Sequence, residues 1–154
     1  MRFREKCERA KERKDERVKV DATIMRKIEK FEDMIAWQKA KMLCILIYAL
    51  LRDSRDFRFR DKIQSAAVSI MNNIAEGFER GSKKEFVQFL NIAKGSSGEV
   101  RSQLYAALDQ EYVSEKDFDS IRDCAVILSR RLSSFILYLE GCSTTRRVKR
   151  AGNR

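Results

Sequence analysis

Residues 72–86 read NNIAEGFERGSKKEF and place two glycines and three cations between two segments of helical apolar spacing. Gly81 stands where a helix ends in the left-handed conformation, which glycine adopts without a Cβ penalty. Ser82 and Glu85 form a capping box, in which the serine hydroxyl accepts from the Glu85 amide. A phosphate-binding glycine loop would need a preceding strand and a richer glycine pattern. The stretch therefore predicts a corner between two helices.

On both sides of this corner, apolar residues recur at intervals of three and four, the spacing of a buried helix face. The pattern predicts four helices, at about residues 31–52, 56–80, 83–111 and 114–140. A second capping box, Ser114 to Asp117, opens the fourth helix, and Gly141 closes it. No strand pattern occurs, and the connections are short. We predict an all-α fold, an up-down-up-down antiparallel four-helix bundle with basic N- and C-terminal extensions.

Three of these helices carry features beyond one apolar stripe. The first is expected to bury Phe31, Ile35, Met42, Ile45 or Leu46, and Ala49. Residues 42–51 are apolar nearly all round, which indicates either a crowded interior or a contact between subunits. Gly77 lies within the second helix, where the missing side chain allows a close helix contact. Gly-Ser-Ser-Gly at 95–98 suggests a loop, but a continuous helix is favoured because the apolar period continues in phase on both sides.

Length and composition indicate one domain that is not an enzyme. A chain of 154 residues suits a single core. Histidine is absent, which removes the commonest general base and the usual nucleophile pairs. The four cysteines lie far apart, so we expect reduced thiols, no cofactor and no metal. No apolar run is long enough to span a membrane and no signal peptide is evident, so we expect a cytoplasmic protein without a membrane partner.

The net charge of +10 lies at the two ends of the chain. Residues 1–30 carry twelve Lys/Arg and seven Asp/Glu, and residues 141–154 carry five Lys/Arg and no acid. The segment between them, 31–140, carries sixteen of each. We therefore divide the chain into a charged N-terminal extension (1–30), a four-helix bundle (31–140) and a basic C-terminal tail (141–154). A neutral body with basic ends is typical of a scaffold whose ends contact a polyanion.

The predicted topology gives this charge a direction. In an antiparallel bundle, both termini lie at the same end as the 80–84 corner, and the acidic turn at 109–123 lies at the opposite end. Copies standing side by side would join their basic ends into one positive face that binds RNA phosphates without reading sequence. The candidate nucleic-acid contacts are Arg80, Lys83, Lys84, Arg146, Arg147, Lys149 and Arg150.

Each candidate also has a purely structural explanation. The two corner lysines could be a solvated helix start, and Glu76 with Arg80 could be an ordinary helical ion pair. The run 146–150 could serve solubility alone. The alternating Phe and Arg at 57–60 could stack on unpaired bases, or the phenylalanines could anchor a loop to the core. Trp37, the one tryptophan, is expected to be a packing or subunit-contact anchor rather than a ligand platform.

Three segments carry a family resemblance: FEDMIAWQKAK at 31–41, AAVSIMNNIAEGFERGSKKEFVQFLNIAKGSSGEV at 66–100 and EYVSEKDF at 111–118. They resemble the bacterial four-helix-bundle proteins called 23S ribosomal RNA intervening-sequence proteins. The structural signature residues in this sequence are Trp37, Asn73, Glu76, Gly77, Ser82 and Glu85. The resemblance implies a short antiparallel bundle, often a ring-like homopentamer, encoded in an insertion within a 23S rRNA gene. The chain departs from it at Met71-Asn72, where Pro-Ser is more usual, and in both basic extensions.

Three functions compete on this evidence. The first is a non-catalytic, oligomeric protein that binds rRNA or another nucleic acid through basic ends. The second is a scaffold whose extra apolar face binds another protein. The resemblance extends to accessory proteins of diversity-generating retroelements, which implies a polymerase or reverse transcriptase as such a partner. The third, a nuclease, has the least support because no carboxylate or metal-ligand cluster stands out.

Overall fold

The computed structural model describes residues 28–151 and the side chains of residues 28–141. A 3-10 turn, η1 (Phe31–Asp33), precedes four helices: α3 (Ile35–Leu50), α4 (Phe57–Glu79), α5 (Lys83–Asp109) and α6 (Glu115–Ala151). This part of the chain contains no strand. The predicted all-α class with four helices is confirmed, whereas most of the predicted N-terminal extension lies outside the described residues.

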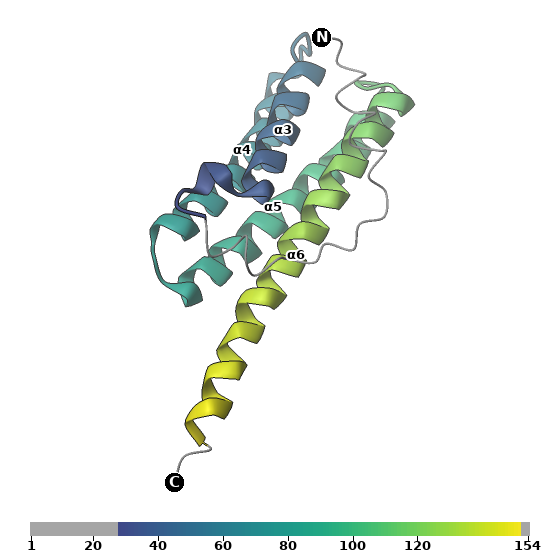
Figure 1. The fold of residues 1–154 in the computed structure, drawn as a ribbon. Helices are drawn as coiled ribbons and strands as arrows, with labels where there is room; N and C mark the ends of the chain where they lie inside the picture. Colours follow the sequence, from purple (N-terminus) through teal and green to yellow (C-terminus); the bar gives the residue numbers. More distant parts are fainter. Residues whose placement is uncertain (1–27, 152–154) are drawn as a thin grey trace.

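The four helices enclose a common core (Figure 1). Consecutive helices pack against each other, and α6 packs back against α3. The chain reverses direction at each connection, so the α4–α5 corner lies at one end of the bundle. The α3–α4 and α5–α6 connections lie at the other end, which we call the far end. Within residues 28–151, no helix is both long and apolar enough to cross a membrane.

Most buried residues of α4, α5 and α6 recur at the helical spacing of three and four, whereas Phe86, Leu108 and Leu139, at the same spacing, are half-buried. The α6 side chains within the core are Phe118, Ile121, Ala125, Leu128, Leu132, Phe135 and Ile136. In α4, Ile63, Ala67, Ile70 and Ile74 are fully buried. α5 runs without a break through Gly-Ser-Ser-Gly at 95–98, with Ser96 and Ser97 buried. The continuous-helix interpretation is therefore confirmed, and the small side chains lie inside the bundle.

The first helix differs from its prediction in both start and orientation. Phe31–Asp33 forms the separate turn η1, and α3 begins only at Ile35. Ile35, which was expected to face the core, is 47% exposed, and Ile45, one of two alternatives with Leu46, is 52% exposed. The α3 residues that are buried are Ala36, Ala40, Leu43, Leu46 and Ile47. Because 42–51 is apolar nearly all round, the apolar period does not determine which face is buried. The prediction of Ile35 as a core residue is wrong, and of the alternatives Ile45 and Leu46 it is Leu46 that is buried.

The fourth helix is longer than predicted. α6 continues past Gly141 to Ala151, so the prediction that Gly141 closes it is wrong. A glycine inside a helix costs about 1 kcal/mol relative to alanine, which does not end a helix by itself. No proline or glycine follows before Gly152, so nothing else in the sequence interrupts the helix. The basic C-terminal segment is therefore continuous in backbone with the bundle, and Figure 1 shows it projecting beyond the body.

Candidate nucleic-acid interface

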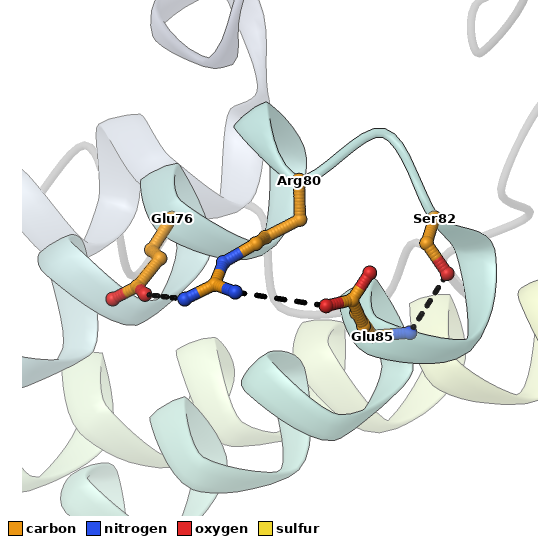
Figure 2. A network of polar contacts seen from close by, with 4 residues as sticks. All are labelled: Glu76, Arg80, Ser82 and Glu85. Carbon is orange, nitrogen blue, oxygen red and sulfur yellow. Dashed lines mark hydrogen bonds and ion pairs between the residues drawn. The ribbon is translucent and has the colours of Figure 1, made fainter.

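The corner between α4 and α5 has the geometry that the sequence predicts. Gly81 adopts a φ of +66°, in the left-handed region that favours glycine. Ser82 caps α5, with its Oγ accepting from the Glu85 N–H at 3.5 Å (Figure 2). The helix-ending glycine and the serine cap confirm the corner interpretation.

Arg80 contacts side chains on both sides of this corner (Figure 2). Its Nη2 lies 2.7 Å from Glu76 Oε1, and its Nη1 lies 3.7 Å from Glu85 Oε1. The guanidinium carbon also lies 5.4 Å from the ring centroid of Phe89. The hydrogen bond to Glu76 raises the pKa of Arg80. The predicted Glu76–Arg80 pair is thus present, and it extends into α5, so Arg80 joins the end of one helix to the start of the next.

The corner carries no excess of positive charge. Residues 76–85 contain three acids against three cations. Lys84 is exposed and Lys83 is half-buried. Adding Glu29 and Lys30 to the sixteen charges of each sign in 31–140 gives seventeen of each over the described side chains. The positive charge of the molecule therefore belongs to the terminal segments rather than to the corner.

The other four candidates, Arg146, Arg147, Lys149 and Arg150, lie on the last part of α6. Figure 1 shows this part of the helix beyond the end of the bundle that carries the α4–α5 corner. Their side chains lie outside the described residues. The backbone nevertheless places all four on one projecting helical segment, separate from the packed body.

Asn73, a residue of the family resemblance, belongs to a polar network between α4 and α5. Its Nδ2 donates to the Ser69 carbonyl oxygen at 2.7 Å and to Ser69 Oγ at 3.1 Å. Ser69 Oγ in turn lies 2.9 Å from Ser96 Oγ on the facing helix. Reasoning from the sequence missed Ser69 and Ser96. The signal that could have found them is the serine four residues before Asn73, facing a small-residue patch.

Gly77 and Trp37 both lie at packing contacts within the bundle. A Cβ on Gly77 would lie 2.6 Å from Phe89 Cβ and 2.9 Å from Phe86 Cδ2, so the missing side chain lets α4 approach α5. The Trp37 ring packs edge-on against Phe31 with centroids 5.2 Å apart. Lys41 Nζ lies 5.5 Å from the Trp37 ring centroid. The close helix contact predicted at Gly77 is confirmed, and Trp37 is a packing residue.

At the far end, the two phenylalanines of the Phe-Arg run have different roles. Phe59 packs against the core and contacts the Tyr112 ring edge-on, with centroids 5.5 Å apart. Phe57 is 60% exposed, and the Arg60 guanidinium lies 4.8 Å from its ring centroid. The anchoring interpretation therefore holds for Phe59 but not for Phe57, which remains accessible.

Asp56 connects this run to the α5–α6 connection. Its carboxylate accepts from the Phe59 N–H and from the Tyr112 hydroxyl, each at 3.0 Å. These hydrogen bonds, the backbone one first, lower the pKa of Asp56. The same contact with the carboxylate raises the pKa of Tyr112. Both connections of the far end are thus joined by side-chain contacts.

The outer face of α3 carries three large exposed apolar side chains among polar ones. Ile35, Ile45 and Tyr48 are each about half exposed, at 47%, 52% and 47%. α3 contains only two charged residues, Lys39 and Lys41, in sixteen positions. Of the two explanations for the apolar excess of 42–51, a crowded interior does not account for these exposed side chains. An unpartnered apolar helix face is the kind of surface that contacts another molecule.

Residues 32–134, about two-thirds of the chain, match the family described as 23S rRNA-intervening sequence protein. The chain belongs to this family. The match coincides with the segments on which the resemblance rests and leaves the basic termini outside. No curated protein matches the chain.

Among solved structures, the chain is similar to a protein with unknown function from the S23 ribosomal protein family of Bacteroides thetaiotaomicron. The TM-score is 0.63 at 24% sequence identity, over 66% of this chain and 98% of that one. At this identity the likeness establishes the fold alone. The two proteins thus share the helical-bundle fold.

Proposed function

We propose that this member of the 23S rRNA-intervening sequence protein family is a non-catalytic, homo-oligomeric RNA-binding protein of the bacterial cytoplasm, and that its basic termini make the RNA contacts. The observation that carries the proposal is the separation of charge. The described side chains sum to zero, whereas residues 141–154 alone carry +5. Clustered cations outside a neutral body are suited to phosphate contacts that release counterions.

The projecting part of α6 is the principal RNA-binding element in this proposal. It extends Arg146, Arg147, Lys149 and Arg150 away from the acids of the bundle, so the phosphate backbone approaches without repulsion from them. Lys83 and Lys84 are secondary contacts, because the three acids of residues 76–85 offset the corner cations. The pairing of Arg80 with Glu76 and Glu85 gives that residue a structural role first.

The binding test replaces the four α6 cations with glutamine and measures affinity for a 23S rRNA fragment across a salt series. Each phosphate contact contributes about −0.7 to −0.9 to the slope of log K against log salt, so losing four contacts should flatten the slope by about three. The matched control replaces Lys39, Lys62, Lys94 and Lys116, four cations of the neutral bundle, and should leave most of the slope. Equal losses in both variants, or no affinity in the unmodified chain, would reject the proposal.

Self-association through the outer face of α3 is the second part of the proposal. Contact with a neighbouring copy would remove the half-exposed side chains of Ile35, Ile45 and Tyr48 from water. The family resemblance implies a pentamer, which for an 18.0 kDa chain has a mass of about 90 kDa. Ile45→Asp should lower the mass seen by light scattering, while Gln88→Asp, on an exposed part of α5, should lower it less.

The alternative function is a scaffold whose α3 face binds a different protein, for example a polymerase. The same exposed apolar side chains support it. The two functions predict different masses for the pure protein. A strictly monomeric chain that binds no RNA favours the scaffold, and one that also captures no partner counts against both.

A further inference from the structure

The far end of the bundle forms one continuous surface from two separate connections. Tyr112, in the α5–α6 connection, donates to Asp56 Oδ2 at 3.0 Å and packs edge-on against Phe59. Both partners of Tyr112 lie at the start of α4. The surfaces on either side of this contact, residues 52–62 and residues 109–123, are therefore held side by side rather than being independent loops.

These two segments carry opposite charge. Residues 52–62 contain five Lys/Arg and three Asp/Glu, an excess of two positive charges. Residues 109–123 contain six Asp/Glu and two Lys/Arg, an excess of four negative charges. We call them the basic sector and the acidic sector. Arg55 and Arg58 of the first sector, and Asp109 and Glu111 of the second, are exposed.

Each sector carries an exposed aromatic side chain. Phe57, next to Asp56 in sequence, is 60% exposed, and Tyr112 is 39% exposed. Arg60 stacks its guanidinium on the Phe57 ring at 4.8 Å. Phe59 already anchors this segment to the core, so the fold does not explain the exposed Phe57 ring. Aromatic rings with a stacked arginine are the side chains that dominate protein–protein interfaces.

We propose that the far end binds the far end of a second copy of this chain, in an end-to-end pair related by a two-fold axis. Such an axis near Phe57 places the basic sector of each copy against the acidic sector of the other, so the surface is complementary to itself. The four excess negative charges of the acidic sector disfavour RNA on the same surface. This contact is distinct from the α3 face and from the basic termini, and it leaves both free.

The test reverses charge in one sector at a time. One variant carries Arg55→Glu and Arg58→Glu, which takes the basic sector from +2 to −2. The other carries Asp109→Lys, Gln110→Lys and Glu111→Lys, which takes the acidic sector from −4 to +1. Acids near the start of α4 and cations near the end of α5 both suit the helix dipole, so both variants should fold. Each should weaken the pair at least a hundred-fold and halve the mass measured by light scattering at low salt. A control with Lys94→Glu and Arg130→Glu, exposed residues of α5 and α6, should retain the full mass.

Mixing the two variants provides the decisive measurement. A copy with two acidic sectors pairs with a copy that has two basic sectors, so the mixture should recover the doubled mass, as should the chain with all five substitutions. Phe57→Ala in the unmodified background should weaken pairing about ten-fold. An unmodified mass equal to that of each reversed variant, or a mixture that stays unpaired, would overturn the proposal. So would a loss of RNA affinity on Phe57→Ala at constant mass.

Discussion

Replacing Gly77 with alanine tests the packing on which the bundle depends. The new Cβ would lie 2.6 Å from Phe89 Cβ and 2.9 Å from Phe86 Cδ2, where ordinary contacts begin at 3.4 Å. The Phe86 ring atom can rotate away. Phe89 Cβ is attached directly to the α5 backbone, so relief of that contact requires the two helices to separate. We therefore expect Gly77→Ala to shift α5 rather than a single side chain.

The expected change in stability is the difference of two opposing terms. Overpacking a well-packed site costs about 1 to 3 kcal/mol, and replacing a mid-helix glycine with alanine returns about 1 kcal/mol of helix propensity. Because the 2.6 Å contact falls on an atom attached to the backbone, the overpacking cost lies in the upper part of that range, about 2 to 3 kcal/mol. We therefore expect Gly77→Ala to lower the free energy of unfolding by about 1 to 2 kcal/mol. For a chain of this size, that corresponds to a fall in Tm of roughly 2 to 8 °C.

Urea denaturation followed by circular dichroism, at one protein concentration, measures this change. Gly95→Ala is the matched control, because a Cβ there would meet nothing within 4 Å. Gly95→Ala should raise the free energy of unfolding by up to about 1 kcal/mol. One variant should therefore be less stable than the unmodified chain and the other more stable. If Gly77→Ala were as stable as Gly95→Ala, the close α4–α5 contact would not constrain the fold as argued.

Three further substitutions probe other local features. Gly81→Ala should destabilise by about 1 to 2 kcal/mol through backbone strain at φ +66°, and Gly81→Asn by less, in the same urea assay. Ser69→Ala should cost about 1 to 2 kcal/mol, because Ser96 Oγ, in a residue 7% exposed, loses its partner; Ser69→Ala with Ser96→Ala should cost less than the sum, and additive costs would contradict the coupling. Because the pKa of Asp56 is lower in the folded chain, its carboxylate stabilises the fold at pH values above the unfolded pKa of about 3.9. This stabilisation is lost as pH falls through the folded pKa. The raised pKa of Tyr112 contributes stability that is lost as pH rises above about 10. Tyr112→Phe should remove the alkaline loss and reduce the acid one; an unchanged pH profile would show that the hydrogen bond does not form in solution.

The sequence was sufficient for helices with a single well-defined apolar face. α4 and α6 have their buried residues where a period of three and four places them, and Ser82 and Ser114 cap where the capping boxes predict. The α3 face could not be predicted in this way, since Ile45 and Leu46 are equally apolar and only packing against α4 and α6 decides between them. The end of α6 was predicted wrongly at Gly141, because glycine weakens a helix but does not end one without a further signal.

The candidate site was harder to predict than the fold, because the net charge of a surface depends on which ion pairs form there. Some of these pairs join residues of different helices and cannot be read from the local sequence. Counting Arg80 with the corner lysines suggested a positive end. Glu76 neutralises Arg80 from one turn earlier in the same helix, while Glu85 approaches it from the next helix. The second of these pairs exists only once the corner has formed. The far-end contact between Asp56 and Tyr112 could not be predicted from the sequence either, because it joins residues fifty-six positions apart.

The separation of neutral body from basic termini links assembly to ligand binding. In a side-by-side ring of five, the 141–154 segments alone would bring together twenty-five positive charges, five from each copy. That repulsion opposes assembly, whereas the neutral body does not, so a polyanion that neutralises the termini must stabilise the ring by as much as the ring strengthens polyanion binding. High salt screens the same repulsion and also weakens phosphate contacts. In the chain with Arg55→Glu and Arg58→Glu, where the far-end pair does not contribute, the mass of the ring should therefore rise with salt in the absence of RNA, while RNA affinity falls. Both dependences follow from excess charge that lies outside the contact between subunits of the ring.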